Sequence, residues 1–351
     1  MRILLYSPVF LPRLGGLEIG QALLSEGLSR LGHEVTVVTQ TAARDRDDFP
    51  FRLVRRPGPL ALLREMRACD VYFQANVSLR GLWPLLLVRR PWAVSHHSWY
   101  CRTNGRVSWR DRLKRYLLRF AACSISVSRA IAADLATPSL VIPNAYRDRL
   151  FRILPGARRP RELAFLGRLV SDKGADVLLS ALARLGQAGL RPRLTVIGDG
   201  PELSALRAQA ATLGLVEQVE FAGEQQDEQI VRRLNEHRIL VVPSRYHEPF
   251  GVVALEGIAC GCVVVGSAGG GLPEAMGPCG RSFRNGDAED LAAVLAALLE
   301  RPEEMEALRA GAAEHLARHG SEQIARLYAA ALAEGLTMRG PARRPSRERA
   351  T

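Results

Sequence analysis

The feature that most constrains this 351-residue chain is an alternation that occurs twice: short β-branched apolar runs followed by stretches of helical periodicity. In the first half, Arg2–Tyr6 is typical of a buried strand, apolar residues recur at helical spacing over 22–31, and 35–39 is a second β-branched run. This βαβ order predicts a parallel sheet covered by helices. After a linker-like segment at 154–160, rich in Pro and Arg, the alternation resumes at 163–167. The sequence therefore predicts two doubly wound α/β domains.

These signals also suggest where the domains begin and end. We expect an N-terminal Rossmann-like domain over 1–155 and a C-terminal Rossmann-like domain over 156–318. A C-terminal helix is expected over 319–338, with a return to the first domain as an open alternative, and a disordered basic tail over 339–351. Doubly wound sheets bind ligands at the carboxyl ends of their strands, so the cleft between the domains is the expected active site.

The net charge of +12 is unevenly distributed. Residues 1–155 carry 24 Lys+Arg against 11 Asp+Glu, whereas residues 156–338 carry 19 against 24. The apolar runs are shorter than the ~20 residues of a transmembrane helix, and no cleavage site follows the first strand, so a cytoplasmic protein is expected. Because the sequence contains no recognised nucleic-acid module, we expect no nucleic-acid partner.

Two glutamates flank a Pro-Phe-Gly turn in the segment Pro243–Glu256, which follows a predicted buried strand. Pro249 and Gly251 shape the turn, and the helix N-terminus after it favours a bound anion such as a diphosphate. If the helix covers most of the interval from Glu248 to Glu256, the two lie about 12 Å apart along its axis. That separation suits contacts with both ends of a nucleotide sugar. The alternative is two surface glutamates.

Glu-Pro-Phe-Gly followed by a second Glu, together with Arg168 and Lys173 in the segment Phe165–Gly174, resembles the retaining glycosyltransferases of family 4. The resemblance covers most of the chain and implies the GT-B fold, in which two Rossmann-like domains face each other across a cleft. It implies that Glu248 contacts the hydroxyls of the donor sugar and that Glu256 binds the nucleotide ribose. It also implies that Arg168 and Lys173 bind the donor diphosphate.

Composition supports a role for Lys173 independently. The chain has only two lysines, Lys114 and Lys173, against a background of arginine. A compact ammonium is retained where a guanidinium would not fit. A cation at a helix start is electrostatically unfavourable unless it binds an anion, so we prefer function over a surface role.

Glycine-rich and strand-end segments match the family as well. The resemblance implies that the backbone of Gly15 and Gly16 contacts donor phosphate or acceptor, and that the turn after residue 197 lies near the nucleotide. A simple βα turn explains Asp199 equally well, since Gly-x-Gly alone is a weak dinucleotide signature. The expected donor-binding residues are Gly15, Gly16, Gly198, Asp199, Pro243, Pro249, Phe250, Gly251, Val252 and Glu256.

Two adjacent histidines end a predicted strand in the segment Ser95–Tyr100. The resemblance places His96 at the active-site histidine and puts His97 where the family often has an acid, so the assignment is open by one residue. The family's Gly-Val-Asp after Asn144 is replaced by Ala145–Arg147.

We therefore expect an enzyme that moves a sugar from a nucleoside diphosphate sugar, with UDP or GDP as nucleotide, to an acceptor hydroxyl with retention. His96, Arg168, Lys173 and Glu248 are the expected catalytic residues. No cofactor is expected, and no metal, because an Asp-x-Asp motif is missing. A glycan or lipid-linked acceptor in cell-envelope polysaccharide synthesis would account for the basic first half. The alternatives are a nucleotide-sugar epimerase of the same fold, a dinucleotide oxidoreductase and a noncatalytic membrane-associated binding protein.

The stretch 109–120 places aromatic and leucine side chains at helical spacing among five basic residues. Such a helix suits the surface of an anionic membrane, and peripheral contact at the inner face of the membrane is one expectation. The alternative is a helix that packs its apolar side on the domain core while its charges are solvated.

Overall fold

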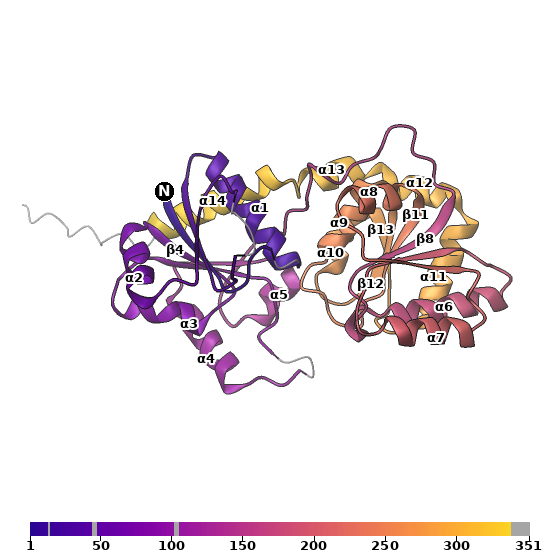
Figure 1. Cartoon of the computed structure of the whole chain (residues 1–351), viewed down its shortest axis with the longest axis horizontal. Helices are drawn as coiled ribbons and strands as arrows, with labels where there is room; N and C mark the ends of the chain where they lie inside the picture. The colour runs from indigo at the N-terminus through magenta and orange to yellow at the C-terminus, as the bar shows by residue number, and fades with distance from the viewer. Residues whose placement is uncertain (13–14, 44–47, 102–104, 338–351) are drawn as a thin grey trace, which may run out of the picture. The chain divides into compact units, whose positions relative to one another are not determined.

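The computed structural model describes residues 1–12, 15–43, 48–101 and 105–337. The chain forms two compact α/β units, each built on a parallel sheet (Figure 1). Among the described residues, the first unit comprises Met1–Ser126, Leu135–Ile142 and the segment from Ala325 to Thr337, and the second comprises Val127–Asp134 and Pro143–Ile324. The tail expected to be disordered, 339–351, lies outside the described residues. The domain limits expected from the sequence stay a prediction.

The sheet of the first unit has seven parallel strands in the order β3-β2-β1-β4-β5-β6-β7. Leu4 of β1 pairs with Thr36 of β2 on one side and with Tyr72 of β4 on the other. The chain thus winds outward in both directions from β1, and the topological switch point lies between β1 and β4. The elements before the second sheet are β1 (Arg2–Ser7), α1 (Gly16–Arg30), β2 (Glu34–Thr39), β3 (Arg52–Arg55), α2 (Pro59–Ala68), β4 (Val71–Ala75), α3 (Leu79–Leu82), the 3₁₀ turn η1 (Trp83–Leu86), β5 (Trp92–His96), α4 (Trp109–Leu117), η2 (Leu118–Phe120), β6 (Cys123–Ser126), α5 (Arg129–Asp134) and β7 (Leu140–Val141).

The second unit repeats the scheme with six parallel strands in the order β10-β9-β8-β11-β12-β13. Leu240 of β11 pairs with Ala164 of β8 and with Val264 of β12, so the switch point lies between β8 and β11. Its elements are β8 (Arg161–Leu166), η3 (Ser171–Lys173), α6 (Ala175–Gln187), β9 (Leu194–Ile197), α7 (Leu203–Thr212), β10 (Val219–Gly223), α8 (Glu228–Asn235), β11 (His237–Val242), α9 (Val252–Ala259), β12 (Val263–Ser267), α10 (Leu272–Met276), η4 (Gly277–Cys279), β13 (Gly280–Phe283), α11 (Ala288–Glu300), α12 (Pro302–Ala310) and α13 (Ala312–Ala317).

The last described helix, α14 (Ser321–Thr337), starts in the second unit and ends in the first. Tyr328 on this helix is buried, and its ring meets that of Phe73 on β4 with centroids 5.9 Å apart. Leu332 is also buried. The C-terminal helix therefore supplies part of the core of the first unit.

The helix expected from Lys173 begins later than predicted. Ser171–Lys173 form a 3₁₀ turn, and α6 starts only at Ala175. Gly174 between them has φ +68°, and a Cβ there would lie 2.0 Å from the carbonyl oxygen of Pro243. Only glycine allows this conformation and this approach. Lys173 consequently lies in the turn before the helix.

Candidate functional site

Two loops meet at the switch point of the second sheet. One follows β8 and runs to Gly174, and the other follows β11 and runs to Gly251. The backbone N–H groups of Arg245 and Tyr246 both donate to the carbonyl oxygen of Asp172, at 2.9 and 3.3 Å. These bonds hold the two loops together at the position where doubly wound sheets bind ligands.

A lysine, a glutamate and a serine are joined between these loops. The Lys173 Nζ donates to Glu248 Oε1 at 2.6 Å, and the Ser244 hydroxyl donates to the same oxygen at 2.7 Å. Ser244 is fully buried and the side chain of Glu248 is 11% exposed, whereas that of Lys173 is 31% exposed. The carboxylate is therefore fixed from inside the unit, and the ammonium reaches it from the solvent side.

The turn after Glu248 is anchored rather than loose. Phe250 is buried, and its ring lies 5.8 Å from that of His319 between centroids. The carbonyl oxygen of Pro249 accepts a bond from the Ser128 hydroxyl at 2.7 Å. Gly251 caps α9, which starts at Val252, so the helix covers only half of the interval from Glu248 to Glu256. The condition behind the expected separation of about 12 Å therefore does not hold.

Glu256 on α9 is a mostly buried carboxyl beside an arginine. The Arg147 Nε lies 3.4 Å from Glu256 Oε1, and Arg147 Nη1 donates to Asp227 Oδ1 at 2.7 Å. Burial raises the pKa of Glu256 to about 7, against the lowering effect of Arg147. Arg147 was not among the residues expected from the sequence. It belongs to the segment after Asn144 that departs from the family pattern, and this departure was the available signal.

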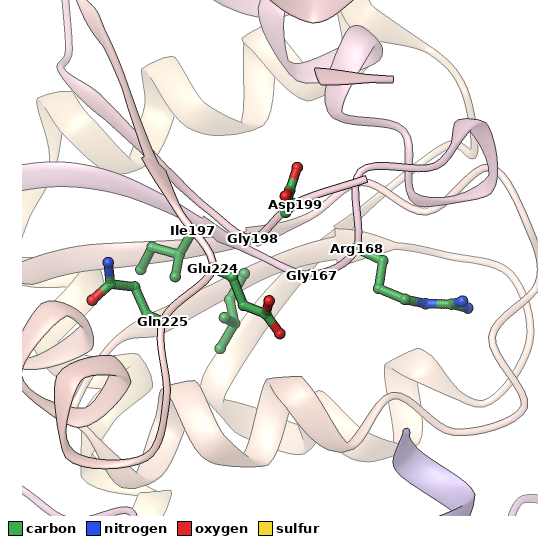
Figure 2. A pocket seen from close by; sticks show the side chains of 8 residues that line it. Gly167, Arg168, Ile197, Gly198, Asp199, Glu224 and Gln225 are labelled. Carbon is green, nitrogen blue, oxygen red and sulfur yellow. The ribbon is translucent and has the colours of Figure 1, made fainter. Parts of the chain in front are cut away.

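A cavity of about 310 Å³ lies at the carboxyl ends of β8, β9 and β10 (Figure 2). It is lined by Leu166, Gly167, Arg168, Ile197, Gly198, Asp199, Glu224 and Gln225. The structure thus brings three expected residues, Arg168, Gly198 and Asp199, to one cavity. Glu224 and Gln225 were not expected, because nothing in their local sequence separates them from ordinary loop residues.

Charge and backbone geometry define this cavity. Figure 2 shows the carboxylates of Asp199 and Glu224 pointing in different directions, with the Arg168 side chain extending away from Glu224. Within the described residues, the exposed Arg168 side chain makes neither a hydrogen bond nor an ion pair. Gly198 has φ +139°, and a Cβ on it would lie 2.0 Å from the carbonyl oxygen of Gly167. The floor of the cavity therefore requires glycine.

The other expected residues belong to the first unit. His96 is fully buried at the end of β5; its Nδ1 lies 2.6 Å from the Tyr100 hydroxyl and its Nε2 3.0 Å from the Ser124 hydroxyl. Burial lowers the pKa of His96 to about 3. His97 is half-buried, with Nε2 2.8 Å from the Ser95 hydroxyl and 3.2 Å from Gln21 Nε2. The structure thus separates a histidine enclosed in the core from one nearer the surface.

Gly15 and Gly16 lie at the start of α1. A Cβ on Gly15 would come within 2.4 Å of a carboxylate oxygen of Glu18, which is itself buried in the first turn. Sequence reasoning did not single out Glu18.

The described residues contain neither a membrane-spanning helix nor a cluster of metal ligands. No helix there is long and apolar enough to cross a membrane. No group of three His, Cys, Asp or Glu side chains in the same residues is arranged to hold a metal ion.

Two protein-family models match the chain. The model described as Glycosyltransferase Family 4 matches residues 14–150, and the model described as Glycosyl transferases group 1 matches residues 147–315. The chain belongs to glycosyltransferase family 4. The resemblance inferred from the Glu-Pro-Phe-Gly segment is thereby confirmed.

Individual relatives are similar to about half of this family 4 chain. Glycogen synthase of Mycobacterium tuberculosis is 35% identical over 188 residues, which are 51% of this chain and 45% of that protein. D-inositol 3-phosphate glycosyltransferase 1 of Catenulispora acidiphila is 39% identical over 179 residues, 48% of this chain and 43% of that protein. The matches thus span less than half the length of these curated relatives.

A solved structure shows the fold of the family 4 chain. HepE from Anabaena, crystallised with UDP and glucose, superposes with a TM-score of 0.77 over 95% of this chain and 99% of that one, at 21% identity. Together with the two parallel-sheet α/β units, this similarity confirms the expected GT-B fold.

Proposed function

We propose that this family 4 chain is a retaining glycosyltransferase that moves a sugar from a nucleoside diphosphate sugar to an acceptor hydroxyl. The observation that carries the proposal is the Lys173–Glu248 pair at the switch point of the second sheet. The same loop after β8 carries Arg168, which lines the cavity and makes neither a hydrogen bond nor an ion pair within the described residues. Cations, a fixed carboxylate and a cavity on loops at the carboxyl ends of one sheet are the parts that a diphosphate sugar requires.

In this proposal the donor spans the loops of the second unit. Arg168, Lys173 and the N-terminus of α9 bind the diphosphate, because cations and helix N-terminal N–H groups stabilise negative charge. Glu248 accepts hydrogen bonds from the sugar hydroxyls, and Glu256 accepts those of the ribose. Gly198 and Asp199 lie beside the nucleotide. UDP and GDP are the proposed nucleotides, and the presence of UDP and glucose in the HepE crystal supports a donor of this kind.

The proposed chemistry stabilises the leaving group. As the bond from the anomeric carbon to the phosphate oxygen breaks, the electron pair stays on the diphosphate, whose added charge Arg168 and Lys173 stabilise. The acceptor oxygen forms its bond on the face that the diphosphate leaves, so the configuration is retained. The acceptor proton passes to the departing phosphate oxygen, which balances the charges. We propose that these two cations take the electrostatic role that a divalent metal has in other transferases.

On the acceptor side we propose a glycan or lipid-linked acceptor of cell-envelope polysaccharide synthesis. The excess of 24 Lys+Arg over 11 Asp+Glu in residues 1–155 supports an anionic or membrane-borne acceptor. Of the two histidines, His97 is the better candidate for contact with sugar or acceptor. His96 is fully buried, whereas His97 is half-buried and lies nearer to solvent. We propose that the backbone at Gly15 and Gly16 also contacts the donor phosphate or the acceptor.

The test is a donor screen followed by product analysis. UDP-, GDP- and ADP-sugars are incubated with purified protein, with and without acceptor glycans, and with and without EDTA. The expected result is turnover of one donor, unaffected by EDTA, with an α-linked product from an α-linked donor as read by NMR coupling constants. An inverted product would overturn retention. Conversion of the donor sugar to its epimer without acceptor would replace transfer by epimerisation.

A further inference from the structure

Helix α4 of the first unit presents its apolar side to solvent. Its aromatic and leucine side chains are three or four residues apart, which places them on one helical face. The exposed fractions of Trp109, Leu113, Tyr116 and Phe120, the last in η2, are 68%, 37%, 51% and 52%. None of the nine residues of α4 is buried. The alternative considered from the sequence, in which this apolar side packs on the domain core, is therefore wrong for these four side chains; of the side chains at this spacing, only Leu117 packs against the core.

The side of α4 that faces the unit is instead largely polar. Ser108 and Asp111 form a capping box at its start, and Lys114 Nζ lies 3.4 Å from Asp111 Oδ1. The same ammonium lies over the ring of buried Tyr100, 5.8 Å from its centroid. At the C-terminal end Leu117 packs against the core while partly buried, and Leu118 of η2 enters it. For most of its length this orientation is the reverse of that of an ordinary amphipathic surface helix.

Arginines surround the exposed aromatic rings. The Arg119 guanidinium carbon lies 4.1 Å from the ring centroid of Tyr116, and that of Arg110 lies 5.4 Å from the centroid of Trp109. Arg112 is exposed on the same helix. Within the described residues, none of these three arginines forms an ion pair. Their charge is thus uncompensated by carboxylates.

Further apolar side chains are exposed on neighbouring elements. Leu60 of α2 is 83% exposed, and Leu86 and Leu87 at the end of η1 are 87% and 67% exposed. The inner sides of α2, η1 and η2 pack into the same core cluster. Figure 1 shows α2, α3 and α4 along one side of the first unit, with α1 and α14 on the other. The strongly exposed leucines therefore belong to elements whose inner sides share a core cluster with η2, the turn that follows α4.

We propose that this side of the first unit binds the surface of an anionic lipid bilayer. The contact centres on the α4 face, which we define as Trp109, Arg110, Arg112, Leu113, Tyr116, Arg119 and Phe120. Tryptophan and tyrosine rings partition into the headgroup region, and arginines are attracted by anionic lipids. A fluid bilayer accommodates separately protruding side chains without matching their shape, whereas a protein partner needs a complementary surface. This inference does not depend on the proposed function.

The test is binding of the full chain to vesicles. Sedimentation with phosphatidylcholine vesicles is compared with an equimolar phosphatidylcholine–phosphatidylglycerol mixture. Binding is expected only to the anionic vesicles, and it weakens as salt is raised. The triple variant R110Q/R112Q/R119Q is expected to bind about a hundredfold more weakly, since each interfacial arginine contributes roughly a factor of five. The matched control removes three exposed arginines of the second unit, R158Q/R191Q/R193Q, and retains binding.

Insertion of the aromatic side is tested separately by tryptophan fluorescence. Wild-type emission is expected to shift to shorter wavelength on anionic vesicles, and Trp109→Phe is expected to lose the shift while still sedimenting. Circular dichroism verifies that every variant folds. Equal binding to neutral and anionic vesicles, no binding to either, or equal losses in both arginine variants would each overturn the proposal.

Discussion

The ammonium of Lys173 lies 2.6 Å from the carboxylate of Glu248, although the two residues come from loops after different strands. The backbone bonds from Arg245 and Tyr246 to Asp172 keep these loops together. In the proposed donor complex, the diphosphate would meet an ammonium that a fixed carboxylate has already oriented. The pair thus prepares a cation in the position proposed for the leaving group.

Replacing Lys173 should remove much of the catalysis. Lys173→Ala is expected to lower kcat/KM by about a hundredfold or more, the effect of deleting one charged donor at a developing anion. Lys173→Arg should recover activity only in part, because a planar guanidinium does not replace a compact ammonium. The control is Arg184→Gln on α6, an exposed arginine paired with Glu289. Initial rates with the identified donor provide the measurement, and normal turnover by Lys173→Ala would remove Lys173 from the mechanism.

The raised pKa of Glu256 should appear in the pH dependence of stability. Burial raises the pKa of this carboxyl from its ordinary value of 4.5 to about 7, so between these pH values the folded state holds a proton that the unfolded state has released. Stability from this group is present below about pH 4.5 and is lost as the pH rises toward 7. Glu256→Gln does not titrate, so its free energy of unfolding should gain roughly 2 to 3 kcal/mol relative to wild type between pH 4.5 and pH 8. Urea unfolding at a series of pH values checks this, and a difference that is constant with pH would contradict it.

Filling the floor of the cavity should be more damaging than adding the same methyl elsewhere. Gly198→Ala introduces a Cβ that would lie 2.0 Å from the Gly167 carbonyl oxygen, at φ +139°. Gly189 also has positive φ, +85°, but nothing lies within 4 Å of an added Cβ. Gly189→Ala should therefore cost only the conformational strain, about 1–2 kcal/mol. Gly198→Ala should cost more than about 3 kcal/mol or displace the loop and weaken nucleotide binding.

Urea unfolding and titration with a fluorescent nucleotide distinguish these outcomes. Equal stability losses in the two alanine variants, with unchanged nucleotide affinity in both, would show that the cavity floor tolerates a side chain.

The two histidines should behave differently on mutation. His96→Ala leaves the Tyr100 and Ser124 hydroxyls without their partner and creates a cavity, so the free energy of unfolding should fall by about 2–4 kcal/mol. Because burial lowers the pKa of His96 to about 3, the wild type should lose stability as the pH falls from 6.5. His97→Ala should cost less stability, because the half-buried ring leaves a smaller cavity, and it should lower kcat. Thermal unfolding and kinetics on both variants provide the check, and a kcat loss confined to His96→Ala would reverse the assignment.

Much of the fold could be predicted because its central strands are buried on both sides. Runs such as 35–39 and 239–242 are β-branched and apolar for that reason. The strands β3 and β13 were not predicted. Both are four residues long and mostly half-buried or exposed. Little pressure for apolar residues acts on them, and their sequences, Arg-Leu-Val-Arg and Gly-Arg-Ser-Phe, contain no continuous apolar run. Edge strands of this kind have little pattern to detect.

Candidate site residues could be named from the sequence, but their arrangement could not. The resemblance named Lys173 and Glu248 separately, and only the pairing of β8 with β11 brings their loops together. The start of α6 was misplaced because the left-handed conformation of Gly174 depends on the distant Pro243. Arg147 and Glu224 could not be recognised, since a charged loop residue acquires its role from neighbours far along the chain.

The path of α14 has a consequence for how the protein is made. Tyr328 and Leu332 belong to the core of the first unit, yet they are synthesised after the whole second sheet. A nascent chain leaving the ribosome can complete its second unit before its first, although domains usually fold in the order of their synthesis. Until the last helix emerges, the face of β4 that carries Phe73 lacks the ring of Tyr328. The unit whose synthesis starts first is thus the unit whose core is completed last.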